Sequence, residues 1–65
     1  MRLAIDIGGT FTDLVLEKNK ILYTKKVLTS VEKPEIAVIE GVLELLYENN
    51  VEPSQIDMII HGTTL

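Results

Sequence analysis

A pair of glycines, Gly8–Gly9, separates two apolar runs near the start of the chain and restricts the possible fold more than any other feature. The run before it, Leu3–Ile7, is short and nearly continuous, which indicates a buried strand. The run after it, Asp13–Glu17, alternates in the manner of a half-buried strand. Gly, Thr and Asp are typical of tight turns. We therefore predict two antiparallel strands joined by a turn at residues 8–13, with Asp6 near the end of the first strand.

The remaining sequence predicts two further strands and one helix. A short polar segment, Lys18–Lys20, favours a hairpin turn, so the first three strands should form an antiparallel meander. Pro34 suits the first position of a helix, and Asn49–Asn50 suits its end, because asparagine tolerates a left-handed backbone. We predict a third strand over Ile21–Leu28, a helix over Glu35–Tyr47, a turn over Pro53–Gln55 and a fourth strand over Ile56–Ile60, followed by His61–Thr64. The fold class is then α/β, a βββαβ unit with a mixed sheet and one helix.

The predicted helix and sheet cannot bury all of their apolar residues against each other. The helix has apolar residues at positions 36, 39, 43, 46 and 47, and Val38, Val42 and Leu45 widen this stripe. The spacing is typical of a helix that covers one face of a sheet. The first and third strands have apolar residues on both faces, and both faces of such a sheet are normally covered. We therefore expect residues 1–65 to be the partial amino-terminal domain of a longer protein. The alternative is a small independent domain that hides its open face by self-association.

Composition narrows the class of protein. The chain has 65 residues, no cysteine and a net charge of −4, so it contains neither disulfides nor a cysteine metal site. The acidic balance argues against a nucleic-acid partner. Lysines at positions 18, 20, 25 and 26 suit an exposed hairpin and sheet edge, where lysine discourages further strand pairing. No apolar run approaches the ~20 residues of a membrane span, and Asp6 interrupts any signal peptide. We expect a cytoplasmic protein without a membrane partner.

The glycine turn matches neither of two known phosphate-binding motifs. No lysine follows Gly9 until Lys18, and the turn leads into a strand instead of a helix. Successive N–H groups of a glycine turn can still bind phosphate. Asp6 and Asp13 would repel a phosphate unless a cation lies between the carboxylates and the phosphate. Mg²⁺ binds one or two carboxylates together with phosphate oxygens. This combination of carboxylates, glycines and hydroxyls predicts a site for magnesium and the phosphates of a nucleotide. The alternative is an ordinary hairpin turn without a ligand.

Two segments resemble the motifs of one protein family. The segment DIGGTFTDLVL, Asp6–Leu16, closely resembles the amino-terminal motif of the hydantoinase/oxoprolinase family, whose members use ATP to open cyclic imides and lactams. The segment HGTTL, His61–Leu65, is similar to that family's second motif. The resemblance implies that the chain is the beginning of a ribonuclease-H-like lobe of an actin-like ATPase. Members of the family have a second lobe and often a partner subunit. Lys33 stands where the family often has aspartate, so the predicted helix lacks a good N-cap.

The resemblance also implies roles for individual residues. Asp6 would hold Mg²⁺ and take part in catalysis, and Asp13 would orient water or substrate. ATP would contact Gly8, Gly9, Thr10, Thr12, Gly62, Thr63 and Thr64. His61 would face the same cleft, without an assigned role.

Three functions are consistent with the resemblance. The first is an ATP-dependent hydrolase for a cyclic amide such as a hydantoin or 5-oxoproline, in which ATP phosphorylates the ring carbonyl oxygen and water then replaces the phosphate. The second is a fragment of a small-molecule kinase or an acetone-carboxylase-type ATPase of the same superfamily. The third is a module with no activity alone. Phe11–Asp13 and His61–Thr64 favour the first over the second. We expect the isolated chain to be inactive and the substrate pocket to lie beyond Leu65 or on another chain.

Overall fold

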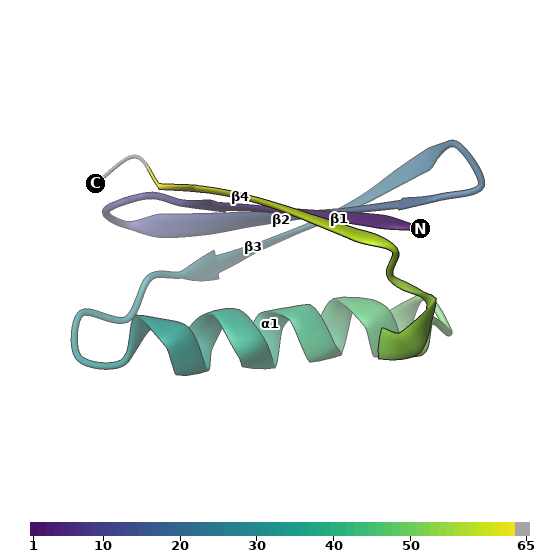
Figure 1. Cartoon of the computed structure of the whole chain (residues 1–65). Coiled ribbons are helices and arrows are strands. Elements are labelled where there is room, and N and C mark those ends of the chain that lie inside the picture. The colour runs from purple at the N-terminus through teal and green to yellow at the C-terminus, as the bar shows by residue number, and fades with distance from the viewer. Residues whose placement is uncertain (64–65) are drawn as a thin grey trace.

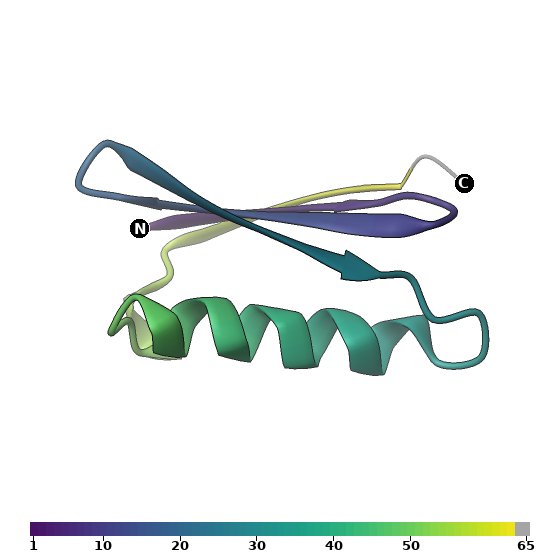
Figure 2. The same cartoon turned by 180° about the vertical axis from the view of Figure 1, so that it is seen from behind.

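The computed structural model describes residues 1–63 and consists of one mixed four-stranded sheet with one α-helix on one face (Figures 1 and 2). Its elements are β1 (Arg2–Ile7), β2 (Phe11–Lys18), β3 (Ile21–Leu28), α1 (Pro34–Glu48), the short 3₁₀ helix η1 (Pro53–Gln55) and β4 (Met58–Thr63). The strand order is β3-β2-β1-β4, in which β2 is antiparallel to both neighbours and β1 is parallel to β4. The predicted βββαβ order and α/β fold class are therefore confirmed.

Two tight turns set the register of the meander. Asn19 and Lys20 join β2 to β3, and both have positive φ (53° and 65°), the backbone that lets a two-residue turn follow the twist of its strands. β2 begins at Phe11, so the glycine turn is shorter than predicted and comprises Gly8–Thr10. The Gly8 N–H donates to the Phe11 carbonyl at 3.0 Å, which continues the strand pairing up to the turn.

The fourth strand, Met58–Thr63, begins two residues later than predicted. Asp57 is tied to the start of the chain instead. Its N–H donates to the Met1 carbonyl at 2.8 Å, and its carboxylate pairs with the Met1 amine. Pairing with β1 then begins at Met58 and continues along the whole length of β1. His61, Gly62 and Thr63 therefore belong to the strand and do not follow it, which corrects the prediction.

The hydrophobic core lies between the sheet and α1 (Figure 1). Its buried residues are Leu3, Leu14, Leu16, Leu45, Leu46 and Val51. Gly41 brings the helix close to the sheet, because an added Cβ there would lie 2.9 Å from Leu14 Cδ1 and 3.0 Å from Val27 Cγ1. Protein interiors are close-packed, so this contact leaves no room for a larger side chain.

α1 faces the sheet with one side of the predicted stripe, because Leu45 and Leu46 are buried and Val38 and Val42 are partly buried. Its buried residues are Gly41, Leu45 and Leu46. The other side of the predicted stripe is exposed: Ile36, Ile39, Leu43 and Tyr47. The reason is that α1 packs on β2 and β3, where Gly41 permits the closest approach. A second apolar side of the helix is consequently left uncovered by residues 1–63.

The ends of α1 agree with the sequence analysis. Pro34 lies in the first turn, and the N-cap residue Lys33 makes no side-chain capping hydrogen bond. At the other end, Asn50 has a φ of 56°, and Lys18 Nζ donates to the Asn49 carbonyl at 2.8 Å. A cation at this position suits the negative end of the helix dipole. No helix within residues 1–63 is long and apolar enough to cross a membrane.

The sheet face opposite α1 is uncovered. Leu22 and Ile60 on this face are more than half exposed and line a shallow hollow of about 200 Å³ with Ala4 and Val15. Apolar patches of this kind normally mark a surface that meets another part of a protein. The expected apolar character of both sheet faces is therefore observed.

An ion pair on the uncovered face gives the first testable prediction. Arg2 donates to Glu17 through Nε (2.8 Å) and Nη2 (2.7 Å), and these bonds hold the pKa of Glu17 below its ordinary value of 4.5. A lowered folded-state pKa stabilises the fold above the unfolded-state value, and this contribution is lost as the pH falls through the folded-state value. We expect Glu17→Gln to unfold at a lower urea concentration than the wild type at neutral pH, by a small margin for an exposed pair.

The difference in urea midpoint between Glu17→Gln and the wild type should disappear well below pH 4.5, where Glu17 is protonated in both the folded and the unfolded state. Glu40→Gln, a change at an exposed helix position, controls for the loss of one negative charge. A margin that persists in acid would contradict the role assigned to the ion pair.

Candidate functional site

Four exposed residues form a row across the uncovered face, one from each strand of the sheet. Asp6 of β1 lies directly opposite Asp13 of β2 and Gly62 of β4, and Asp13 lies opposite Lys26 of β3. Figure 1 shows the glycine turn and the end of β4 at the same edge of the sheet. We call Gly62, Asp6, Asp13 and Lys26 the carboxylate row. The topology thus brings both predicted catalytic aspartates to one place.

The two aspartates of the row repel each other. Directly opposed residues of antiparallel strands have Cβ atoms about 4.5–5.5 Å apart, and like charges at that separation destabilise a sheet. Lys26 Nζ lies 3.5 Å from Asp13 Oδ1 and 5.3 Å from the centroid of the Phe11 ring. Within residues 1–63, Asp6 has no ion pair and no side-chain hydrogen bond. The charge of Asp6 is therefore available to a cation from outside this part of the chain.

Neither the backbone conformation of the turn nor contacts with the described residues require glycine at positions 8 and 9. Neither Gly8 nor Gly9 has a positive φ, unlike the two residues of the β2–β3 turn. An added Cβ would meet described atoms within 4 Å at Gly41 and Gly62, and no such contact is found at Gly8 or Gly9. What glycine provides at these positions is open backbone, which lets a ligand approach the N–H groups closely.

The threonines of the first motif lie in different environments. Thr10 is exposed in the turn. Thr12 is fully buried on the helix-covered side of the sheet, where its hydroxyl oxygen lies 3.0 Å from that of Thr29. The Thr29 hydroxyl donates to the Gly8 carbonyl at 2.8 Å. Thr12 is therefore connected to the turn through Thr29, and it lies on the opposite face from the carboxylates.

The residues of the second motif alternate between the two faces of β4. Gly62 lies beside Asp6, and an added Cβ at Gly62 would be 4.0 Å from Asp6 Oδ1. His61 and Thr63 pair with the helix-facing residues of β1, so they lie on the other face from the carboxylate row. Thr64 lies outside the described residues. The structure therefore brings Gly62 to the carboxylates and does not bring His61 there.

The row alone does not form a complete metal site. Within residues 1–63, no three His, Cys, Asp or Glu side chains gather into a group that could hold a metal ion. Asp6 and Asp13 are two carboxylates, and Mg²⁺ commonly takes one or two carboxylates while water and phosphate oxygens complete its six ligands. Metal binding by Asp6 and catalysis by Asp13 stay predictions.

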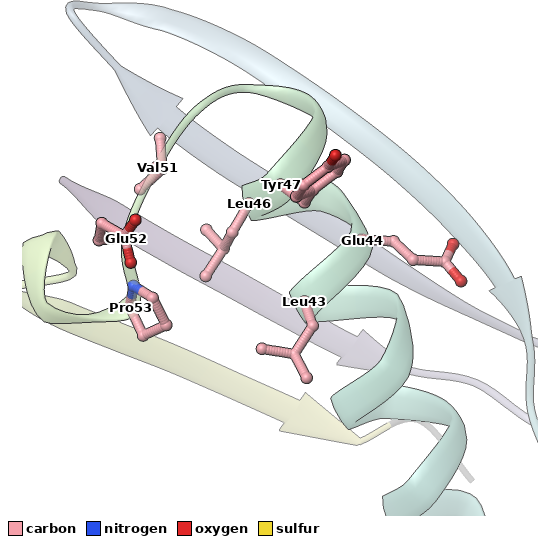
Figure 3. A pocket seen from close by; sticks show the side chains of 7 residues that line it. All are labelled: Leu43, Glu44, Leu46, Tyr47, Val51, Glu52 and Pro53. Atoms are coloured by element: carbon pink, nitrogen blue, oxygen red, sulfur yellow. The ribbon is translucent and has the colours of Figure 1, made fainter.

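A larger hollow, about 430 Å³, lies beside the last turn of α1 (Figure 3). Its lining residues are Leu43, Glu44, Leu46, Tyr47, Val51, Glu52 and Pro53. This end of α1 lies far along the sheet from the glycine turn (Figures 1 and 2). None of the predicted site residues lines the hollow, so it is separate from the candidate site.

Two residues at the site, Lys26 and Thr29, were not predicted from the sequence. Lys26 was predicted to be an ordinary residue of an exposed sheet edge, and no role was predicted for Thr29. A signal for both exists in the Asn19–Lys20 turn. Counting outward from a two-residue turn pairs Asp13 with Lys26, and continuing past the strand end places Thr29 opposite Thr10.

Comparison with known proteins gives two matches. The family model described as the hydantoinase/oxoprolinase N-terminal region matches residues 2–65. An uncharacterized protein of Methanocaldococcus jannaschii is 39% identical over 66 residues. That alignment covers 98% of this chain and 9% of the relative, so the chain spans a small part of the length of the curated relative that it matches.

Proposed function

Because the chain belongs to the hydantoinase/oxoprolinase N-terminal region family, we propose that it binds the phosphates of Mg²⁺–ATP as part of an ATP-dependent hydrolase that opens cyclic amides such as hydantoins or 5-oxoproline. The observation that carries the proposal is that Asp6 and Asp13 lie opposite each other, beside a turn whose backbone conformation does not require glycine. The proposal includes a second, actin-like lobe contributed by residues outside these 65 or by a partner subunit.

The side chains of the row fit a magnesium ion. Asp6 and Asp13 are hard oxygen ligands on an exposed surface, and Asp6 has no cation of its own within residues 1–63. An ion held by Asp6 would offset the repulsion between the two carboxylates and the repulsion between a carboxylate and a phosphate. When bound, Mg²⁺–ATP supplies the phosphoryl group that activates the amide carbonyl. Asp13, beside Lys26, is the group that we assign to orienting water or substrate.

The glycine turn is assigned to the phosphates. The Gly8 N–H already donates to the Phe11 carbonyl, so the backbone N–H groups of Gly9 and Thr10 would donate to phosphate oxygens, and the exposed Thr10 hydroxyl adds a further donor. Gly62 leaves the side of Asp6 open, because it has no side chain to occupy that space. Thr12 supports the turn from the buried side and is not assigned to direct ATP contact.

The uncovered apolar surfaces are assigned to the rest of the enzyme. The exposed stripe of α1 and the open face of the sheet would pack against further residues of a longer chain or against a partner subunit. Catalysis in a cleft depends on closure that excludes water, and residues 1–63 would supply one wall of such a cleft. We therefore expect the chain alone to bind nucleotide weakly and without turnover. Its uncovered apolar faces should cause it to self-associate.

Gly9→Ala tests the function assigned to the turn. A methyl group at Gly9 would stand where a phosphate must approach, so we expect the dissociation constant for Mg²⁺–ATP to rise at least about tenfold, the equivalent of 1.4 kcal/mol. Because Gly9 does not need a positive φ, the fold should be unchanged or stabilised by about 0.4–1 kcal/mol. Amide chemical shifts during titration with Mg²⁺–ATP measure the affinity, and urea unfolding measures the stability.

Lys20→Ala, at the other tight turn, is the matched control and should alter neither the affinity nor the set of amides that shift. Equal affinity of Gly9→Ala and the wild type would contradict phosphate binding by the turn. A loss of affinity accompanied by an equal loss in Lys20→Ala would also contradict it.

A further inference from the structure

Thr29, the residue that follows β3, contacts the glycine turn at two points. Its N–H donates to the Thr10 carbonyl at 2.8 Å. Its hydroxyl donates to the Gly8 carbonyl at 2.8 Å. Gly8 and Thr10 flank Gly9, so one residue holds the turn on both sides of its exposed glycine.

The hydroxyl of Thr29 has a second partner, and the direction of that bond can be deduced. The oxygen lies 3.0 Å from the Thr12 hydroxyl, and the distance alone permits either oxygen to donate. A hydroxyl has one proton to donate, and a carbonyl can only accept. The Thr29 proton is therefore used at Gly8, and Thr12 must donate to Thr29. The result is a chain of hydrogen bonds from Thr12 through Thr29 to the Gly8 carbonyl, in which each bond polarises the next.

The buried end of this chain fixes its position. Thr12 is fully buried on the helix-covered face. A buried hydroxyl that loses its partner is costly, so the Thr12–Thr29 bond resists breaking. The hydrogen bonds therefore connect a buried part of the fold to a turn on the surface.

The geometry of the peptide unit carries this effect to the N–H groups. A peptide is planar, and in the trans form its N–H points in the opposite direction to its C=O. No cis peptide occurs within the described chain. The carbonyls of Gly8 and Thr10 both point to Thr29, so the N–H groups of Gly9 and Phe11 in the same two peptides point away from it.

We propose that Thr29 is the positioning residue of the glycine turn, and that it presets the Gly9 and Phe11 N–H groups for a phosphate by holding the carbonyls of Gly8 and Thr10. The consequence for phosphate rests on the proposed function, whereas the consequence for the order of the turn does not. A turn ordered before binding loses less entropy when the ligand arrives, which raises affinity.

Three variants test the proposal by NMR on the chain. Thr29→Val removes the hydroxyl and keeps the shape, and Thr29→Ser restores the hydroxyl. The double variant Thr12→Val/Thr29→Val removes both hydroxyls, so it leaves no buried hydroxyl without a partner and should regain stability. A purely structural role predicts that the double variant also regains the order of the turn. Our proposal predicts that it does not, because the Gly8 carbonyl is still released.

The first readout is the backbone order parameter at Gly9 and Thr10, which we expect to fall from about 0.85 to below about 0.6 in Thr29→Val and in the double variant. Thr29→Ser should match the wild type. The second readout is affinity for Mg²⁺–ATP, which we expect to fall about tenfold in the same two variants as preorganisation is lost. Thr24→Val removes an exposed hydroxyl from β3 and is the matched control, with no change expected in either readout.

The outcomes separate this inference from the proposed function. Loss of order in the two valine variants, with rescue by serine, supports positioning by Thr29. The same loss of order in a chain that shows no Mg²⁺–ATP shifts also supports it, and overturns the proposed function. An ordered turn in the double variant, or a failure of serine to restore order, overturns the inference whatever the nucleotide result.

Discussion

Replacing Asp6 by asparagine is expected to abolish the Mg²⁺ dependence of nucleotide binding while the sheet stays folded. The amide keeps the size of the side chain and removes its charge. Loss of a residue that supports a metal ligand typically costs 10–100-fold in metal affinity, so loss of the ligand itself should cost at least about tenfold. Affinity for ATP with Mg²⁺ should therefore fall to the value measured in excess chelator.

The stability of Asp6→Asn should change in the opposite direction to its affinity. Asp6 and Asp13 are directly opposed like charges, so removal of one charge relieves a repulsion. We expect Asp6→Asn to unfold at the same urea concentration as the wild type or at a slightly higher one. A site that costs stability is common where residues are retained for function. This combination distinguishes a binding residue from a structural one.

Titration with ATP in the presence of Mg²⁺ and in excess chelator, followed by amide shifts, measures the Mg²⁺ dependence. Glu40→Gln is the control for net charge, because Glu40 is exposed on α1 and has no ion pair within residues 1–63. Mg²⁺-dependent affinity within a factor of about three of the wild type, less than 1 kcal/mol, would remove Asp6 from the site.

Replacing Gly41 by leucine is expected to unfold the chain or to remove most of its stability. The first carbon of the new side chain would already lie 2.9 Å from Leu14 Cδ1 and 3.0 Å from Val27 Cγ1, and three more carbons must follow. Overpacking costs typically 1–3 kcal/mol for smaller insertions, so we expect a loss of about 3 kcal/mol or more. Stability of about 0.05–0.15 kcal/mol per residue leaves little reserve in so short a chain.

Two further variants separate crowding from helix propensity. Gly41→Ala gains up to about 1 kcal/mol of helix propensity, which opposes its smaller clash with Leu14 Cδ1 and Val27 Cγ1. Glu40→Leu places the same side chain at the neighbouring, exposed position and should not destabilise the fold. Urea unfolding and far-ultraviolet circular dichroism provide the measurement. Equal midpoints for Gly41→Leu and Glu40→Leu would show that α1 does not pack on the sheet through Gly41.

Local patterns in the sequence were sufficient to predict the elements. Apolar alternation, the polar residues at 18–20 and Pro34 each act within a few neighbouring residues, so the three strands of the meander and the helix were found. The bounds of β4 were wrong because they depend on distant partners. Asp57 is bonded to Met1, and the strand continues as far as β1 can pair with it.

The helix shows the limit of periodicity most clearly. More than one side of α1 is apolar, and spacing alone predicted one wide stripe that includes both the buried Leu45 and the residues Ile36, Ile39 and Leu43. The last three residues are exposed, and the buried side is centred on Gly41. A glycine adds nothing to an apolar stripe. It determined the packing because it brings the helix backbone close to Leu14 and Val27.

For the candidate site, the sequence by itself determined that a carboxylate would lie near the end of the first strand and that an open glycine turn would follow it, since both depend on residues adjacent in the chain. Only the tertiary structure decided that Asp13 and Lys26 join Asp6 on one face, that Thr12 is buried on the other, and that Thr29 holds the turn. The face on which a side chain lies, and the neighbour it meets, are set by strand register and by the surface that α1 covers. Both bring together residues far apart in the sequence.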